Sequence, residues 1–153
     1  MALNGGLHTS TQRINLLSDP TTKTAGLTIS AAVSATTTTP VTRLGGAWYL
    51  VVQAKFLFGA GGTSVDAYVQ TSVDGGVSWI DIMQFSFAGV ALTKVSAVAL
   101  STALAPAVAP VDGALTANTI LNGLFGDRLR LKYVTVGIYS GATSLKVDAV
   151  IKQ

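Results

Sequence analysis

Acid–base chemistry in this chain would depend on seven aspartates and one histidine, because the sequence has no glutamate and no cysteine. Asp66 and Asp81 flank a turn and could face each other as a carboxylate pair of the kind that glycosidases use. The alternative is that both are solvated, or paired with a cation such as Lys55. His8 lies in a predicted N-terminal arm, which offers a general base no rigid frame. We therefore predict no catalytic residue and no enzymatic activity.

The same aspartates are the candidates for a metal site. Calcium requires only oxygen ligands, so Asp74 and Asp81 together with carbonyl groups could bind it. No metal-binding loop pattern surrounds them, and the lack of cysteine excludes thiolate ligands and disulfides. The glycine-rich stretch 59–62 is not followed by Lys-Ser or Lys-Thr, as a phosphate-binding loop would be. We predict neither a metal nor a cofactor.

The turn Asp74-Gly75-Gly76 joins two runs of alternating residues between positions 64 and 87, a pattern that predicts a β-hairpin. Trp79 falls out of step with the alternation that follows it, as in a bulged strand. An aspartate beside glycine commonly bonds the backbone amides of its own turn. We predict that Asp74, Gly75, Gly76 and Trp79 form a structural hairpin, with Trp79 packed beneath the turn.

Residues 72–79, Ser-Val-Asp-Gly-Gly-Val-Ser-Trp, resemble the Asp-box of sialidases and related propeller proteins, with Ser78 in place of threonine. In those families the box is a hairpin staple remote from the catalytic site, and it recurs in successive blades. Here it occurs once, and a chain without glutamate cannot contain the catalytic glutamate of sialidases. The resemblance thus supports a structural role for the hairpin and no role in glycan hydrolysis.

The elements that position these residues are predicted to be strands. Alternating or β-branched runs cover residues 26–33, 47–58, 64–73, 77–87, 92–100, 128–136 and 143–151, and the last two are expected to form a closing hairpin. Residues 116–125 fit a short strand or a helical turn. No segment has a sustained period of 3.6 residues. The pattern predicts a single all-β domain over residues 26–153, an antiparallel β-sandwich of jelly-roll-like topology.

Residues 1–25 are predicted to form an extended N-terminal arm, because glycine, asparagine, serine and Asp-Pro are mixed with isolated aliphatic residues. Those aliphatic side chains need an apolar surface to cover them. We expect the arm to dock on the body of the protein or on a neighbouring subunit. The candidate interface residues of the arm are Leu3, Leu7, Ile14, Leu16 and Leu17.

Arg128, Arg130 and Lys132 are the one local cluster of charge, and their period-two spacing places them on one face of a strand. Three readings fit: a solvated outer face, salt bridges at a subunit contact, or a nucleic-acid site. Three charges without interleaved aromatic side chains are too few for nucleic acid. We retain the three residues as candidate interface residues.

Only 11% of the residues are charged and 49% are apolar, whereas about 25% charged is typical. Because interspersed charge keeps surfaces apart, a surface this poor in charge favours association. We expect a homo-oligomer whose exterior is largely covered by other subunits. The longest apolar stretch, residues 88–111, is interrupted by Lys94, Pro106 and Pro110, so no membrane span is predicted.

Taken together, residues 45–153 resemble the small β-sandwich structural proteins of tailed-bacteriophage virions. The resemblance is carried by Tyr-Val-Gln-Thr-Ser-Val-Asp-Gly-Gly-Val-Ser-Trp-Ile-Asp-Ile at 68–82 and Gly-Asp-Arg-Leu-Arg-Leu-Lys-Tyr at 126–133. It implies a non-enzymatic virion protein of the head-decoration, head-spike-base or neck type, in contact with capsid, vertex or neck proteins. The alternative is a carbohydrate- or receptor-binding module that presents Trp48, Tyr49 and Tyr139 to its ligand. Against this alternative, Trp48 and Trp79 could be core residues and Tyr139 a residue of a hairpin loop.

Overall fold

The structure, a computed structural model, describes residues 10–19, 21–22, 25–29, 35–39, 42–100 and 107–153. These residues contain strands, turns and no helix, which confirms the predicted all-β class. The strands are β1 (Thr11–Leu17), β2 (Leu27–Thr28), β3 (Ala35–Thr38), β4 (Thr42–Arg43), β5 (Tyr49–Leu57), β6 (Ala60–Gly61), β7 (Ser64–Ser72), β8 (Ile80–Phe87), β9 (Leu92–Ala99), β10 (Arg128–Val136), β11 (Tyr139–Ser140) and β12 (Ser144–Lys152).

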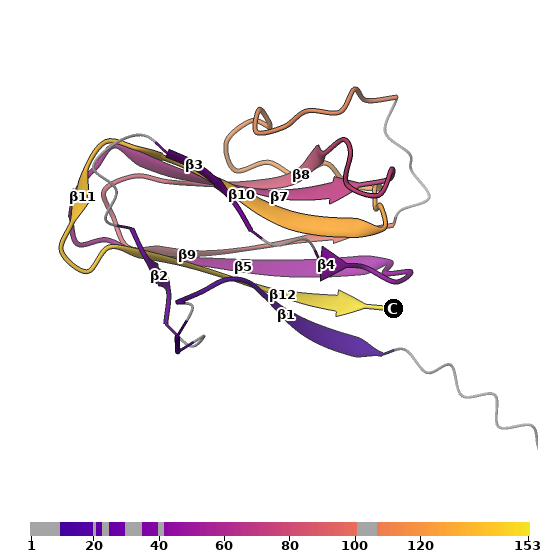
Figure 1. The fold of residues 1–153 in the computed structure, drawn as a ribbon, viewed down its shortest axis with the longest axis horizontal. Coiled ribbons are helices and arrows are strands. Elements are labelled where there is room, and N and C mark those ends of the chain that lie inside the picture. Colours follow the sequence, from indigo (N-terminus) through magenta and orange to yellow (C-terminus); the bar gives the residue numbers. More distant parts are fainter. Residues whose placement is uncertain (1–9, 20, 23–24, 30–34, 40–41, 101–106) are drawn as a thin grey trace, which may run out of the picture.

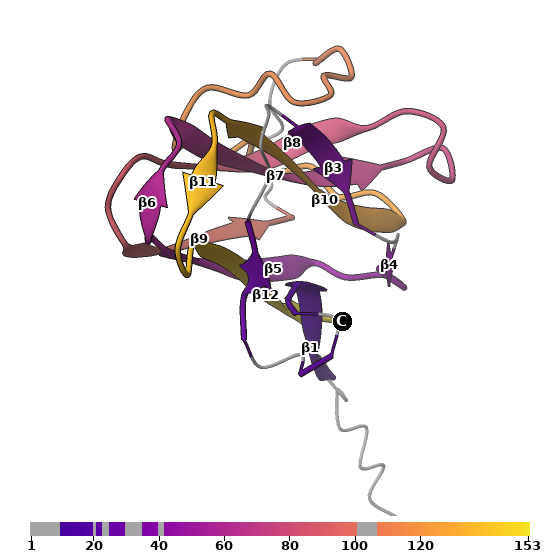
Figure 2. The same ribbon diagram turned by 60° about the vertical axis from the view of Figure 1, so that its left-hand side comes forward.

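Two antiparallel sheets pack face to face as a β-sandwich (Figure 1). Sheet A has the order β1-β12-β5-β9, with β2 also paired to β12. Sheet B has the order β3-β10-β7-β8, with β4 also paired to β10. The short strands β6 and β11 pair with each other at one end of the sandwich, which Figure 2 brings forward and which we call the β11 end.

Among the strands of four or more residues, the chain changes sheet at every step except the β7–β8 hairpin. This alternation between layers is compatible with the predicted jelly-roll-like topology. It also corrects one expectation, the closing hairpin. Strand β10 lies in sheet B and β12 in sheet A, so residues 137–143 cross between the layers instead of forming a tight turn.

The predicted boundary of the arm at residue 25 is corrected as well. Strand β1 is part of the sandwich, because it pairs with β12 along its length. Ile14, Leu16 and Leu17 lie in the hydrophobic core of their own chain and are not available to a neighbouring subunit. Their aliphatic side chains gain more from this burial than from an exposed arm. Leu3, Leu7 and His8 lie outside the described residues.

The core is built from the inward-facing residues of both sheets, as strand alternation dictates. Phe56 of sheet A stacks on Phe87 of sheet B with ring centroids 5.2 Å apart, and both rings are shielded from solvent. Such a buried aromatic pair contributes about 0.5–1.5 kcal/mol beyond its burial alone. The core therefore uses all the long strands, and functional side chains must lie on the outer faces, edges and ends.

Candidate functional sites on the outer faces and the β11 end

The Asp74 carboxylate is fully engaged by its own turn. It accepts hydrogen bonds from the backbone N–H groups of Val77 and Ser78 at 3.0 and 2.9 Å, and from the hydroxyls of Ser72 and Ser78. The hydrogen bonds from Ser78, followed by those from Ser72 and Val77, hold the pKa of Asp74 well below its usual range. A carboxylate with this many donors stabilises the turn and is poorly suited to move a proton.

The two glycines and the tryptophan complete this hairpin. Gly75 and Gly76 have φ values of +75° and +100°, a region that side chains with a Cβ rarely adopt. The indole N–H of Trp79 donates to the carbonyl oxygen of Gly76 at 3.1 Å, and the ring is 7% exposed. Trp79 is thus a buried residue beneath the turn and presents no open ring to a ligand.

Asp66 and Asp81 do not form a carboxylate pair. In the β7–β8 register Asp66 lies opposite Ser86, while Asp81 lies opposite Gln70. The two aspartates are thus five residues out of register, and the one-residue shift between Val69 and Gln70 is too small to bring them together. Lys55 is no partner for either of them, since it lies on β5 of the other sheet.

Asp81 is a buried anchor for a loop. Its side chain is 2% exposed and accepts hydrogen bonds from the backbone N–H groups of Gly113, Ala114 and Leu115 at 2.8–3.1 Å. The Nε2 of Gln70 donates to the same carboxylate at 2.6 Å. Donors, not oxygen ligands, surround Asp81, so the site is unlike a calcium site. Over the described residues, no three His, Cys, Asp or Glu side chains gather as metal ligands.

Residues 107–125 run along the open edge of β8 and cover it. The backbone N–H of Asp81 donates to the carbonyl of Val111, and that of Leu121 donates to Ile82 at 2.9 Å. Further along, Gln84 N–H donates to the Thr119 carbonyl at 3.0 Å. A covered edge cannot pair with another chain. No pattern in the sequence predicts this role for residues 107–125, and the nearest signal is Asp112 followed by Gly113.

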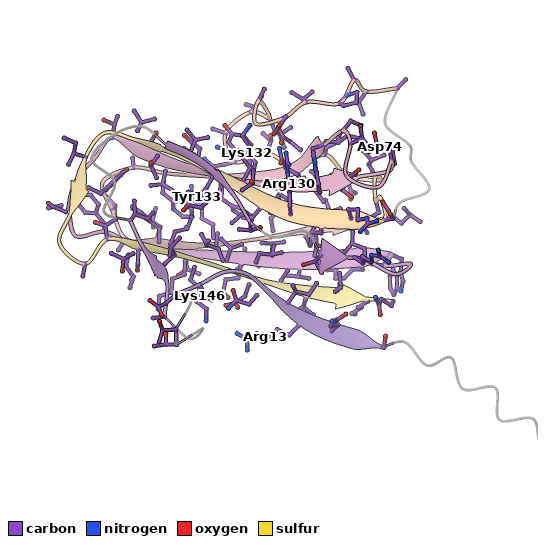
Figure 3. The ribbon with its side chains drawn as sticks, viewed as in Figure 1. Arg13, Asp74, Arg130, Lys132, Tyr133 and Lys146 are labelled. Carbon is purple, nitrogen blue, oxygen red and sulfur yellow. The ribbon has the colours of Figure 1, made fainter. Side chains whose placement is uncertain are left out.

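Arg130 and Lys132 point away from the core, as their spacing predicts, and both pair with Asp112 of the same loop. The ion-pair distances to Asp112 are 3.2 and 2.9 Å (Figure 3 labels both cations). Burial opposes ionisation of Asp112, but hydrogen bonds from Gln70 and Lys132 and the charges of Lys132 and Arg130 outweigh it and lower its pKa. These cations therefore stabilise their own chain.

The remaining contacts of this basic cluster are also internal. Arg130 stacks on the Trp79 ring with its guanidinium carbon 4.0 Å from the ring centroid, and its Nε donates to Gln70 Oε1. Arg128 pairs with Asp127 at 3.1 Å. The outer face of sheet B is a satisfied polar network, and a role for these cations at a subunit contact stays a prediction.

The outer face of sheet A is different, because charged residues from three strands meet there and none of the segments that the structure describes covers them as residues 107–125 cover sheet B. Lys55 on β5 lies directly opposite Lys146 on β12. Asp148 Oδ2 pairs with Lys146 at 3.2 Å and with Arg13 of β1 at 3.5 Å (Figure 3 labels Arg13 and Lys146). A groove of about 480 Å³ runs between these residues and is also lined by Thr28, Gln53 and Ser144.

Sequence reasoning missed this groove, since its charges come from positions 13, 55, 146 and 148 and form no local motif. A smaller hollow of about 260 Å³ shares Arg13, Gln53 and Asp148 with it. Its other walls are the aliphatic side chains of Val51, Val95 and Val150. The outer face of sheet A thus has a cationic half beside an aliphatic half.

Aliphatic side chains are exposed together at the β11 end. They lie at the ends of β5 and β10, at the start of β9 and in the connections β8–β9 and β10–β11, which register places at the same end of the strands. Their exposed fractions are 44% for Leu57, 61% for Val90, 47% for Leu92, 37% for Val136 and 62% for Ile138.

The aromatic residues considered for sugar binding differ in their exposure to solvent. Tyr139 is 3% exposed, and its ring packs so closely on Gly62 that a Cβ there would overlap it, so Tyr139 cannot present its ring to a ligand. Trp48 is 43% exposed and is not a core residue. It lies beside Tyr49 with ring centroids 5.9 Å apart, at the end opposite β11.

Comparisons with protein-family models, with curated proteins and with solved structures found no match for this chain. In the described part of the chain, no helix has the length and apolar character to cross a membrane.

Proposed function

We propose that this protein is a non-enzymatic structural subunit of a tailed-bacteriophage virion, which associates with copies of itself and docks on capsid, vertex or neck proteins. The observation that carries the proposal is the group of exposed aliphatic side chains at the β11 end, including Val90 and Ile138 at 61% and 62% exposure. Apolar residues gathered in this way on a surface characterise interaction sites.

The composition supports the same proposal. A surface with few charges lacks the repulsion that keeps monomers apart, and burial of apolar area provides the driving force for association. The resemblance of residues 45–153 to virion β-sandwich proteins supplies the biological setting. The hairpin and the network around Asp81 are internal stabilising features.

The oligomeric state tests the role of the β11 end. We expect the purified protein to sediment as a discrete oligomer, and the double variant Val90→Lys/Ile138→Lys to sediment as a monomer. Val73→Lys/Val77→Lys is the matched control, because Val73 and Val77 are 60% and 86% exposed in the Asp74 turn at the opposite end. A monomeric wild type, or dissociation by the control as well, would contradict the proposal.

Truncation separates the arm from the sandwich. We expect deletion of residues 1–9 to preserve the circular dichroism spectrum and melting temperature while preventing incorporation into virions, measured by mass spectrometry of purified particles. Deletion of residues 1–20 should instead cause loss of folding, because it removes β1 and the buried Ile14, Leu16 and Leu17. Normal incorporation of the shorter deletion would show that the arm is not needed for docking.

A carbohydrate- or receptor-binding role is the second candidate, and the exposed Trp48, which lies beside the half-buried Tyr49, favours it. Adjacent aromatic rings can stack on apolar faces of a ligand. Glycan-array binding that is lost in Trp48→Ala and kept in Tyr139→Phe would support this role over assembly alone.

A further inference from the structure

Two lysines face each other on the outer surface of sheet A. Lys55 and Lys146 are cross-strand neighbours in the β5–β12 register. Like charges placed directly opposite each other destabilise a sheet. Asp148 relieves Lys146, at 3.2 Å, whereas Lys55 has no carboxylate within ion-pair distance among the described residues. The fold therefore retains an unfavourable pair that an anion between the two ammonium groups would relieve.

The groove around this pair has a surplus of positive charge. Its charged lining consists of Arg13, Lys55 and Lys146 against the single carboxylate of Asp148. Asp148 is already shared by Arg13 and Lys146. The hydroxyls of Thr28 and Ser144 add hydrogen-bond donors to the same walls. A volume of about 480 Å³ lies within the range of about 300–1,000 Å³ found for ligand sites.

The smaller hollow beside the groove indicates what kind of anion the face would bind. It shares Arg13 and Asp148 with the groove, and its further walls are Val51, Val95 and Val150. Val95 is 61% exposed, so its aliphatic surface is accessible. A free phosphate would use the cationic half alone. A peptide that carries a carboxylate beside an aliphatic side chain would use both halves.

We propose that the outer face of sheet A is a docking site for an extended acidic peptide segment of another protein, with its carboxylate between Lys55 and Lys146 and an aliphatic side chain against Val95. Asp148 positions Lys146 and Arg13 for this contact. The groove adjoins the β11 end, because Leu57 lines both, but Lys55, Lys146 and Val95 are not among the exposed aliphatic residues of that end. In a virion the natural source of such a segment is the protein on which this subunit docks, and in that respect the proposal extends the proposed function.

Selection from a random heptapeptide display library tests the site. We expect peptides selected on the wild-type protein to contain Asp or Glu next to an aliphatic residue. A synthetic consensus peptide should bind about tenfold more weakly to Lys55→Gln/Lys146→Gln, measured by fluorescence anisotropy. Arg43→Gln controls for the loss of a positive charge outside the site, because Arg43 is an exposed cation on β4, in the other sheet. Its affinity should equal that of the wild type.

Three further measurements distinguish the docking site from a simple anion site. Replacing the acidic residue of the peptide by its amide, or Val95 by Ser, should weaken binding, and raising the salt concentration should weaken it further. Selection of neutral peptides, unchanged affinity in the lysine variant, or full competition by inorganic phosphate with no effect of Val95→Ser would overturn the proposal. Sedimentation of the chain alone is read independently, so failure here is distinguishable from failure of the proposed assembly.

Discussion

The two outer faces of the sandwich both carry basic residues, but within the described part of the chain only on sheet B are the basic residues paired with a carboxylate of a covering loop. On sheet B, Arg130 and Lys132 are adjacent in the sequence pattern and each pairs with Asp112 of the covering loop. On sheet A, Lys55 and Lys146 come from distant positions and face each other, with Lys55 unpaired among the described residues. The basic cluster that is adjacent in the sequence, Arg130 and Lys132, stabilises its own chain. The lysines that are distant in the sequence, Lys55 and Lys146, lie on the face that no described segment covers.

The physical reason is the loop of residues 107–125. It covers the edge of β8 and brings both the Asp112 carboxylate and the amides bound by Asp81 to the outer face of sheet B. Buried polar groups are stable only when they have hydrogen-bond partners, and this loop supplies them. No described segment covers the outer face of sheet A in this way, so its charges are left for solvent or another molecule.

The largest expected difference between the faces follows from removing one aspartate on each. Asp81→Ala should lower the free energy of unfolding by about 2–4 kcal/mol, because it leaves three backbone N–H groups without their acceptor and removes one of the two carboxylates that accept from Gln70. Asp148→Ala should cost about 1 kcal/mol or less, since it breaks only two ion pairs near the surface.

Urea denaturation monitored by circular dichroism measures both changes. Amide exchange at residues 113–115 provides the local readout, which should rise in the Asp81 variant only. Equal losses of stability in the two variants would show that the covering loop does not distinguish the faces.

Acid should open the outer face of sheet B before the sandwich unfolds. The pKa of Asp112 is lower in the folded state, so its contribution to stability is present above its unfolded pKa of about 3.9 and is lost as the pH falls toward the folded value. Arg130 lies 4.0 Å from the centre of the Trp79 ring, so Trp79 fluorescence reports on the network.

The measurement is best made in a Trp48→Phe background, where Trp79 is the sole indole. Asp112→Asn should remove this acid transition and leave the one that belongs to the Asp74 turn, whose carboxylate also has a lowered pKa. An identical acid profile in the Asp112 variant would show that the network is not the origin of the transition.

The smallest expected effect has opposite signs on the two faces. Lys132→Gln should destabilise the protein by about 1 kcal/mol, because it removes an ion pair whose lysine side chain is 15% exposed. Lys55→Gln should leave stability unchanged or raise it by up to about 0.5 kcal/mol, because it relieves the contact with Lys146. Thermal melts at low and high salt measure both, and loss of stability in Lys55→Gln would mean that Lys55 has a stabilising partner.

Local patterns anticipated much of the fold. Alternation at Val65, Ala67 and Val69 predicted the strand that the structure contains as β7, and Asp74-Gly75-Gly76 predicted the β7–β8 turn. Patterns of this kind are local, because side-chain period and turn conformation depend on neighbours in the chain. The Asp74 site could be described in advance for the same reason, since its hydrogen-bond partners lie within four residues.

Pairings between distant strands could not be anticipated. The closing hairpin was wrong because the alternation of β10 and β12 is the same whether they pair or lie in opposite sheets. Asp66 and Asp81 were considered as a pair because both lie on the hairpin, but Asp66 lies opposite Ser86, five residues beyond Asp81, which is more than the one-residue shift of a bulge. Residues 11–17 looked like an arm because their partner, β12, is the last strand of the chain.

The sequence by itself determined an all-β antiparallel sandwich, a tight Asp-Gly-Gly hairpin and a surface poor in charge, since these depend on composition and on contacts within a few residues. The tertiary structure decided which charges are satisfied and which are exposed. Arg130 and Lys132 are neutralised by Asp112 of a loop that folds back on them, and Lys55 on β5 lies opposite Lys146 on the neighbouring strand β12. Charge pairing depends on distances in space, and only the packing of distant segments sets those distances.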